Sequence, residues 1–132
     1  MEKPLANTSF IFNEPIDGAY LIDLYAADYV MIEETFADVL REYDEFVDRI
    51  ITTYHEGDIA GLKSAVHKLK PLFGFVGLTT LQTLCLQFEN ACPKAASAHE
   101  LKPQFDTLQQ QMLQAKSVIG SELSRLTAFN RG

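Results

Sequence analysis

Apolar residues recur at spacings of three and four positions through most of this chain, a pattern that predicts amphipathic helices. The longest stripes run from Ile32 to Tyr54 and from Leu101 to Leu126. Two shorter stripes lie between them, over 62–76 and 81–92. No segment alternates apolar and polar residues between hairpin signals, so we expect no strands. The chain is therefore predicted to be all-α.

Residues that favour helix ends fall between these stripes. Asp28 and Asp58 are expected N-cap residues, because a short carboxylate can accept hydrogen bonds from free backbone N–H groups of a first turn. Gly57 is expected to end the long first helix, and Gly77 and Pro93 interrupt the pattern again. The sequence thus predicts four main helices joined by short connections.

Four amphipathic helices must bury their apolar stripes against one another. With short connections, the simplest solution is an antiparallel, up-and-down four-helix bundle. A short extra N-terminal helix is expected from Asp17–Gly18 onward. We predict an irregular N-terminal arm over 1–16, the helical bundle over 17–128 and a frayed tail over 129–132.

Composition narrows the function classes. The chain has 132 residues, which suits one domain, and its net charge of −7 argues against nucleic acid as a partner. No apolar stretch approaches the roughly 20 residues of a membrane span, and the N-terminus lacks the apolar core of a signal peptide. We therefore expect a cytoplasmic protein without membrane attachment. Cys85 and Cys92 lie seven residues apart on one helical face, too far for a disulfide within the helix, so both are predicted to be buried thiols.

One histidine lies on the polar side of the second main helix. At roughly 100° per residue, His67 falls about 140° from the centre of the apolar stripe, on the flank that also carries Lys63, Lys70 and Gly74. No Asp or Glu occurs over 61–88, although the chain as a whole is acidic. An exposed imidazole between ammonium groups is suited to carry an anionic group. The alternative interpretation is that the stretch without acidic residues arose by chance.

Pro71 interrupts the same helical pattern. A proline inside a helix lacks the N–H that would bond the carbonyl four residues earlier, and it costs roughly 3 kcal/mol. That carbonyl belongs to His67. One hypothesis is that a slight kink frees this carbonyl and tips His67 outward; the other is a tolerated bend on a solvent face.

Other chemistries lack the residues they need. His55 and His99 are not spaced with His67 for metal ligation. No glycine loop follows a strand to bind phosphate, and no nucleophilic serine motif is present. No acidic residue lies near His67 in the sequence to orient it as a base. The remaining alternatives are His67 as a nucleophile toward a phosphoryl group and His67 as a surface histidine without chemistry.

The positions around His67 form a motif. It consists of His67-Lys68-Leu69-Lys70, then Gly74, then Gly77-Leu78, then an apolar helix that ends near Phe88-Glu89. Together these positions resemble the histidine phosphotransfer (HPt) domain of multistep two-component phosphorelays. That family commonly has glycine at the position of Pro71, so the departure concerns helix geometry next to the histidine.

The resemblance implies a phosphorelay intermediate that is not an autonomous kinase. His67 would accept a phosphoryl group from a receiver-domain aspartate and pass it to another receiver. Lys70 would stabilise the phosphoryl oxygens, and Lys63 could assist. The partners would be receiver domains of response regulators or hybrid kinases. No cofactor is expected in this chain, because Mg²⁺ would come with the receiver, and a monomer is expected.

The resemblance also implies that receivers dock on the face around His67. The expected docking residues are Lys68, Pro71, Gly74, Phe75, Gly77, Gln82, Leu86 and Glu89. Two other functions stay open at this point. One is an HPt-like interaction module that binds a signalling partner without phosphoryl transfer, and the other is a helical-bundle phosphatase or kinase that uses His67.

Overall fold

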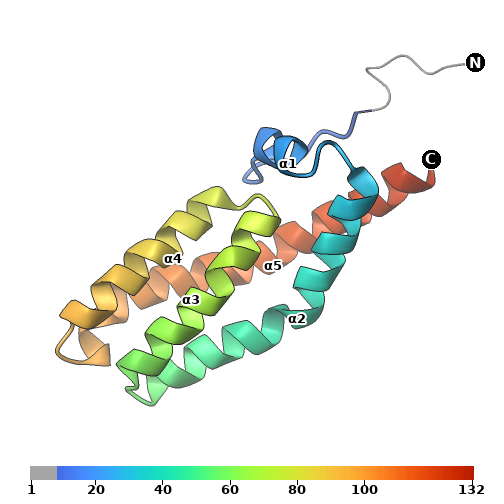
Figure 1. Cartoon of the computed structure of the whole chain (residues 1–132). Coiled ribbons are helices and arrows are strands. Elements are labelled where there is room, and N and C mark those ends of the chain that lie inside the picture. The colour runs from blue at the N-terminus through green and yellow to red at the C-terminus, as the bar shows by residue number, and fades with distance from the viewer. Residues whose placement is uncertain (1–8) are drawn as a thin grey trace, which may run out of the picture.

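The computed structural model describes residues 9–132, and within that range it contains helices and no strands. The elements are α1 (Gly18–Leu24), α2 (Tyr29–His55), α3 (Ile59–Phe75), α4 (Thr79–Ala91), the short 3-10 helices η2 (Cys92–Lys94) and η3 (Ala98–Leu101), and α5 (Lys102–Arg131). Figure 1 shows α2 to α5 side by side with alternating directions, and α1 across one end of them. The predicted antiparallel four-helix bundle with a short N-terminal helix is confirmed.

Three aspartates set where helices begin. The side chains of Asp17, Asp28 and Asp58 accept hydrogen bonds from backbone N–H groups three residues later, at 3.0, 3.0 and 2.9 Å. Each bond satisfies one of the donors that a first helical turn leaves free. The N-caps predicted at Asp28 and Asp58 are therefore confirmed, and Asp58 directly starts the helix that carries His67.

The apolar stripes meet in one core. Its members in the four long helices include Ile32, Phe36, Val39, Tyr43, Val47 and Ile50 of α2, Leu62, Ala65, Val66, Leu69 and Phe73 of α3, Leu81, Cys85 and Phe88 of α4, and Phe105, Leu108, Met112, Ala115, Ile119 and Leu126 of α5. Both cysteines are free and buried, as predicted. Burial raises the pKa of the Cys85 thiol to about 12, so the thiol is protonated at neutral pH.

The turn between α3 and α4 fixes how these two helices face each other. Gly77 has a φ of +75°, which glycine adopts without steric cost, and the N–H of Leu78 donates to the carbonyl of Phe73 at 2.8 Å. The N–H of Asp17 donates to the carbonyl of Gly77 at 2.8 Å, which ties the start of α1 to this turn. The turn is thus held by one hydrogen bond to the end of α3 and by another from the N-terminal segment.

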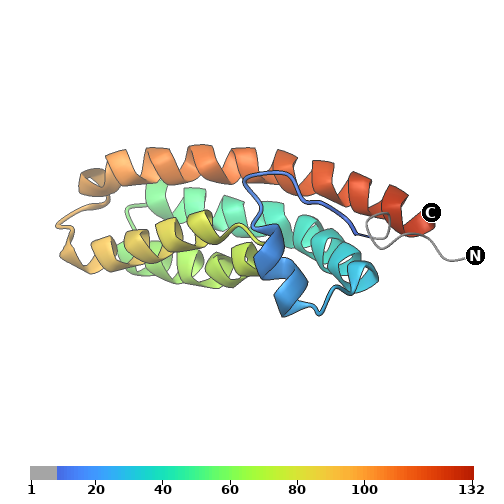
Figure 2. The same cartoon turned by 90° about the horizontal axis from the view of Figure 1, so that it is seen from above.

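The N-terminal segment and the end of α5 lie together. Figure 2 shows residues 9–16 running alongside α5, from near its C-terminal end back toward its middle. Over 9–16 the chain is irregular, as expected, and residues 1–8 of the predicted arm lie outside the described residues. The frayed tail predicted over 129–132 is wrong, because α5 continues to Arg131. Asn130 anchors this last turn by donating to the carbonyl of Tyr29 at 2.9 Å and to Glu33 at 2.7 Å.

Among the described residues, no helix combines the length and the apolar character needed to cross a membrane.

Candidate functional site

His67 lies on the solvent side of α3, as the helical periodicity predicted. Its side chain is 68% exposed, whereas Val66 and Leu69 on either side of it are fully buried in the core. The backbone that carries the imidazole is the middle of a continuous α-helix, which contains Pro71 and is held at its start by Asp58. The ring is therefore presented to solvent from a rigid support.

A buried carboxylate from the neighbouring helix holds the inner nitrogen of this ring. Glu89 of α4 has a side chain only 7% exposed, and its Oε1 lies 2.7 Å from His67 Nδ1. Its Oε2 lies 2.7 Å from Lys70 Nζ. Glu89 was expected to face a docking partner, and that expectation is wrong, since the side chain points inward between α3 and α4. Glu89 instead contacts both His67 and Lys70 from the neighbouring helix.

The charge state of Glu89 follows from these contacts. Burial by itself raises the pKa of the carboxyl, but the hydrogen bonds and charges of Lys70 and His67 outweigh burial and hold the pKa below its ordinary value. Glu89 is therefore an anion at neutral pH and can only accept hydrogen bonds. Consequently Nδ1 of His67 donates its proton toward Glu89, and in the neutral imidazole the lone pair is then on Nε2. Among the described residues, none bonds Nε2.

The three lysines near His67 have different environments. Lys70 is only 21% exposed and is held by Glu89, so it acts first as the counter-ion of that carboxylate. Lys63, one turn before His67, and Lys68 are exposed, and neither forms an ion pair within residues 9–132. These two ammonium groups are the ones available to an incoming anion.

Gly74 is not open to a partner as expected. The residue is buried, and a Cβ at this position would lie 2.7 Å from the Nε2 of Gln82 on α4. The side-chain amide of Gln82 thus occupies the space that the missing Cβ leaves. Gln82 itself is half-buried, so it covers Gly74 and still reaches the surface.

The other expected docking residues divide into exposed and buried ones. Pro71 is exposed inside α3, and Phe75 and Leu86 are 46% and 47% exposed. Gly77 is buried, because Leu21 and Ile16 pack where its side chain would be, so its predicted part in docking is wrong. The exposed apolar side chains among the expected docking residues are therefore those of Pro71, Phe75 and Leu86.

The sequence did not predict the contact between His67 and Glu89, but it follows from the register of the α3–α4 hairpin. In an antiparallel helical hairpin, residues equally far from the turn lie opposite each other. His67 and Glu89 are each eleven residues from Leu78, and Gly74 and Gln82 are each four residues from it. Counting outward from the predicted turn would have placed a carboxylate beside His67, whereas a search of nearby sequence positions could not.

Within residues 9–132, His67 is the one histidine paired with a carboxylate. Residues 9–132 hold no group of three or more His, Cys, Asp and Glu side chains arranged to bind a metal ion. His55 and His99 lie at the opposite end of the bundle from α1, beside the connections that follow α2 and η2.

Comparison with known proteins gives a family and a fold. The family model described as Hpt domain matches residues 34–118. A solved structure, the HPT domain from the Hpt sensor hybrid histidine kinase from Shewanella, is similar with a TM-score of 0.74 and 23% sequence identity. The alignment covers 83% of this chain and 94% of that chain, and it shows a shared fold. No curated protein matches the chain.

Proposed function

Because this chain belongs to the Hpt domain family, we propose that it is a phosphorelay intermediate that carries a phosphoryl group on Nε2 of His67. The family membership confirms the resemblance carried by the motif around His67. The observation that supports this residue is the pairing of an exposed imidazole with a buried anion. That pairing fixes both the orientation of the ring and the nitrogen that is free to react.

The transfer step uses the lone pair that Glu89 leaves on Nε2. This nitrogen attacks the phosphorus of an aspartyl phosphate on a receiver domain. The N–P bond forms while the P–O bond to the aspartate breaks, and the aspartate leaves as a carboxylate. Phosphoryl transfer depends mainly on positioning and on neutralising charge. Transfer to a second receiver is the reverse of this step with a different aspartate.

Glu89 would assist by balancing charge. Attack by a neutral imidazole leaves positive charge on the ring, and the carboxylate at 2.7 Å from Nδ1 stabilises that charge. The Nδ1 proton stays in place, so no proton has to leave before the bond forms. Lys70 keeps Glu89 ionised, which makes Lys70 a positioning residue in this state of the protein.

Lys63 and Lys68 would meet the phosphoryl oxygens and the acidic pocket of the receiver. Both are exposed on α3, in a stretch without acidic residues over 61–88. Opposite charges on two docking surfaces speed their encounter and fix their orientation. Phe75 and Leu86 would add apolar contacts at the edge of this surface. Mg²⁺ remains the contribution of the receiver, and the chain acts as a carrier without kinase activity of its own.

A labelling experiment tests the proposal. A receiver domain carrying a radiolabelled aspartyl phosphate is mixed with the wild-type protein, with His67→Gln and with the matched control His99→Gln. We expect acid-labile, base-stable label on the wild-type protein and on His99→Gln, and none on His67→Gln. Binding of the receiver without label would instead support an interaction module. Catalytic release of inorganic phosphate would support a phosphatase.

A further inference from the structure

Several structural features lie outside the residues that the Hpt family model matches. Residues 10–16, here called the strap, precede the matched range of 34–118, as does α1. The last turns of α5, which bind the strap, follow the matched range. These parts of the chain form a connected module at the end of the bundle where α3 meets α4.

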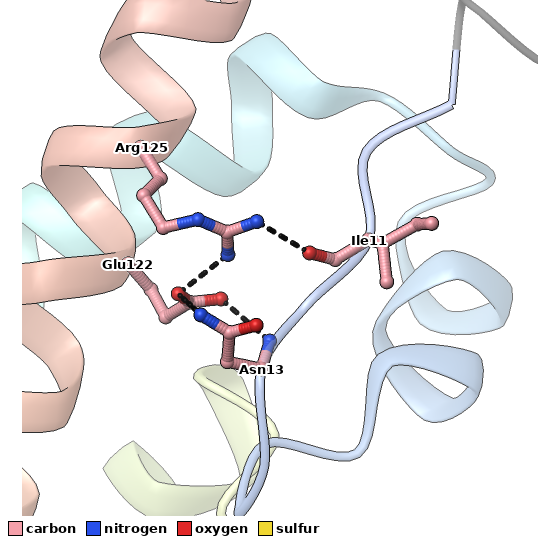
Figure 3. Close-up of polar contacts among 4 residues, drawn as sticks. All are labelled: Ile11, Asn13, Glu122 and Arg125. Atoms are coloured by element: carbon pink, nitrogen blue, oxygen red, sulfur yellow. Dashed lines mark hydrogen bonds and ion pairs between the residues drawn. The ribbon is translucent and has the colours of Figure 1, made fainter.

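Two charged residues of α5 bind the backbone of the strap (Figure 3). Glu122 is 2% exposed, and its carboxylate accepts hydrogen bonds from the backbone N–H of Asn13 at 3.0 Å and from the Asn13 side chain at 3.3 Å. The guanidinium of Arg125 donates two hydrogen bonds, one to the carboxylate of Glu122 at 2.6 Å and one to the backbone carbonyl of Ile11 at 2.8 Å. If the strap moved away, this buried carboxylate would lose both hydrogen bonds from Asn13 and keep only the one from Arg125.

Aromatic packing holds the first residue of the strap. Phe10 is 6% exposed and lies edge-on to Phe129 of α5, with ring centroids 5.5 Å apart. The guanidinium of Arg125 covers the Phe10 ring at 4.6 Å from its centroid. The ring is thereby enclosed between the end of α5 and the side chain that also binds the strap backbone.

The other end of the strap reaches the α3–α4 turn. Ile16 is buried and packs against Gly77, where a Cβ would lie 3.1 Å from its Cγ2. Beyond the strap, the hydroxyl of Tyr25 donates to the carbonyl of Phe75 at 2.8 Å. One continuous set of contacts therefore runs from Glu122 and Arg125 to the end of α3, where Phe75 is exposed.

We propose that the strap is a clasp that holds α1 and the α3–α4 turn in the conformation to which a receiver domain binds. Glu122 and Arg125 then control docking affinity from a distance and take no part in the chemistry at His67. This proposal rests on the proposed phosphorelay function. When the clasp is released, only a fraction of molecules keep the docking surface formed, and the apparent dissociation constant rises in inverse proportion to that fraction.

The test compares Glu122→Ala and Arg125→Gln with the wild-type protein. The matched control is Lys116→Gln, which removes the pair between Lys116 of α5 and Asp44 of α2, 2.9 Å apart, without touching the strap. Transfer from a labelled receiver is measured over a range of receiver concentrations. If a tenth of the molecules keep the surface formed, the half-saturating concentration rises about tenfold in the strap variants. The rate at saturating receiver, set by His67 and Glu89, stays at the wild-type value.

Amide hydrogen exchange supplies a second readout that does not depend on transfer. In the strap variants, exchange is expected to speed up over residues 10–25 and 76–80 while the amides of α2 and α5 that lie in the core stay protected. Unchanged exchange, or faster exchange with an unchanged half-saturating concentration, would overturn the clasp. If Glu122→Ala unfolds the domain, Asn13→Ala removes one contact of the same carboxylate and takes its place. Absence of label on the wild-type protein would instead overturn the phosphorelay proposal.

Discussion

The Oε1 atom of Glu89 lies 2.7 Å from Nδ1 of His67, although the two residues sit on different helices. Because Glu89 is buried and its pKa lies below the ordinary value, the carboxylate accepts a hydrogen bond from Nδ1, and in the neutral imidazole Nε2 is then the nitrogen with a free lone pair. In the proposed function, Glu89 of α4 therefore determines which nitrogen of the histidine on α3 accepts the phosphoryl group. The contact between Glu89 and the exposed His67 ring leads to the first two predictions.

Removing the charge of Glu89 should slow phosphoryl transfer without abolishing it. Glu89→Gln keeps a side-chain oxygen that can accept from Nδ1 but cannot balance positive charge on the ring. A hydrogen bond to a charged group contributes about 1.5–3 kcal/mol, and each 1.36 kcal/mol is tenfold in rate. We expect the transfer rate at saturating receiver to fall by roughly tenfold to a hundredfold.

Nitrogen NMR of the His67 ring provides the control for this prediction. At a pH where the ring is neutral, Nδ1 of the wild-type protein should show the shift of a protonated nitrogen and Nε2 that of an unprotonated one. In Glu89→Ala, which removes the acceptor, the two tautomers should mix. Wild-type transfer rates in both variants would contradict a part for Glu89 in the reaction.

The same carboxylate should make folding stability depend on pH. Its pKa in the folded protein lies below the ordinary value of 4.5, so the unfolded chain takes up the proton first as the pH falls. The stability that Glu89 contributes is then fully present above 4.5 and is lost as the pH falls through the folded pKa. We expect the difference in unfolding free energy between wild type and Glu89→Gln to shrink below pH 4.5, measured by urea titrations at several pH values. A difference that is constant with pH would contradict this.

Two glycines with similar backbone angles allow a matched comparison of the α3–α4 turn. Gly57 and Gly77 have φ values of +73° and +75°. An added Cβ meets nothing within 4 Å at Gly57, but at Gly77 it lies 2.9 Å from Leu21 Cγ. Gly57→Ala should cost only the strain of a left-handed residue, about 1–2 kcal/mol. Gly77→Ala should cost a further 1–3 kcal/mol or so for overpacking, as measured by urea unfolding. Equal losses would show that Leu21 adjusts freely.

The exposed lysines of α3 should speed receiver docking through their charge. Lys68→Gln is expected to lower the association rate by about two- to fivefold at low salt, with little effect at high salt, because exposed charges are screened. Lys116→Gln removes one positive charge from α5, which packs mainly on α2 and α4, and should leave the rate unchanged. Stopped-flow measurements at two salt concentrations check both variants. Equal effects of the two substitutions would indicate net charge alone and not the α3 surface.

The fold was predictable from the sequence because its determinants are local. The apolar stripes at spacings of three and four state which face of each helix is buried, and Asp28, Asp58 and Gly57 mark helix ends through their own side chains or backbone freedom. Short connections then leave the antiparallel bundle as the simple way to cover the stripes. For the same reason the predicted exposure of His67 is confirmed, since it depends only on the helical period.

The errors concern residues whose environment comes from another segment. Gly77 was expected at the docking surface, but Ile16 and Leu21 cover it. The tail was expected to fray, but Asn130 bonds to Tyr29 and Glu33 far away in the sequence. No local pattern distinguishes a covered glycine from an exposed one, or an anchored helix end from a free one.

By itself, the amino-acid sequence determined that this chain forms amphipathic helices, where most of them begin, and that one imidazole with its lysines faces water, because these properties follow from residue type and the 3.6-residue period. Only the tertiary structure decided which nitrogen of His67 is free, that Lys70 is held by Glu89, and that α5 binds the N-terminal strap. Each of these depends on a pair of side chains brought within hydrogen-bond distance by packing of separate segments, and a distance between segments is not a property of either one alone.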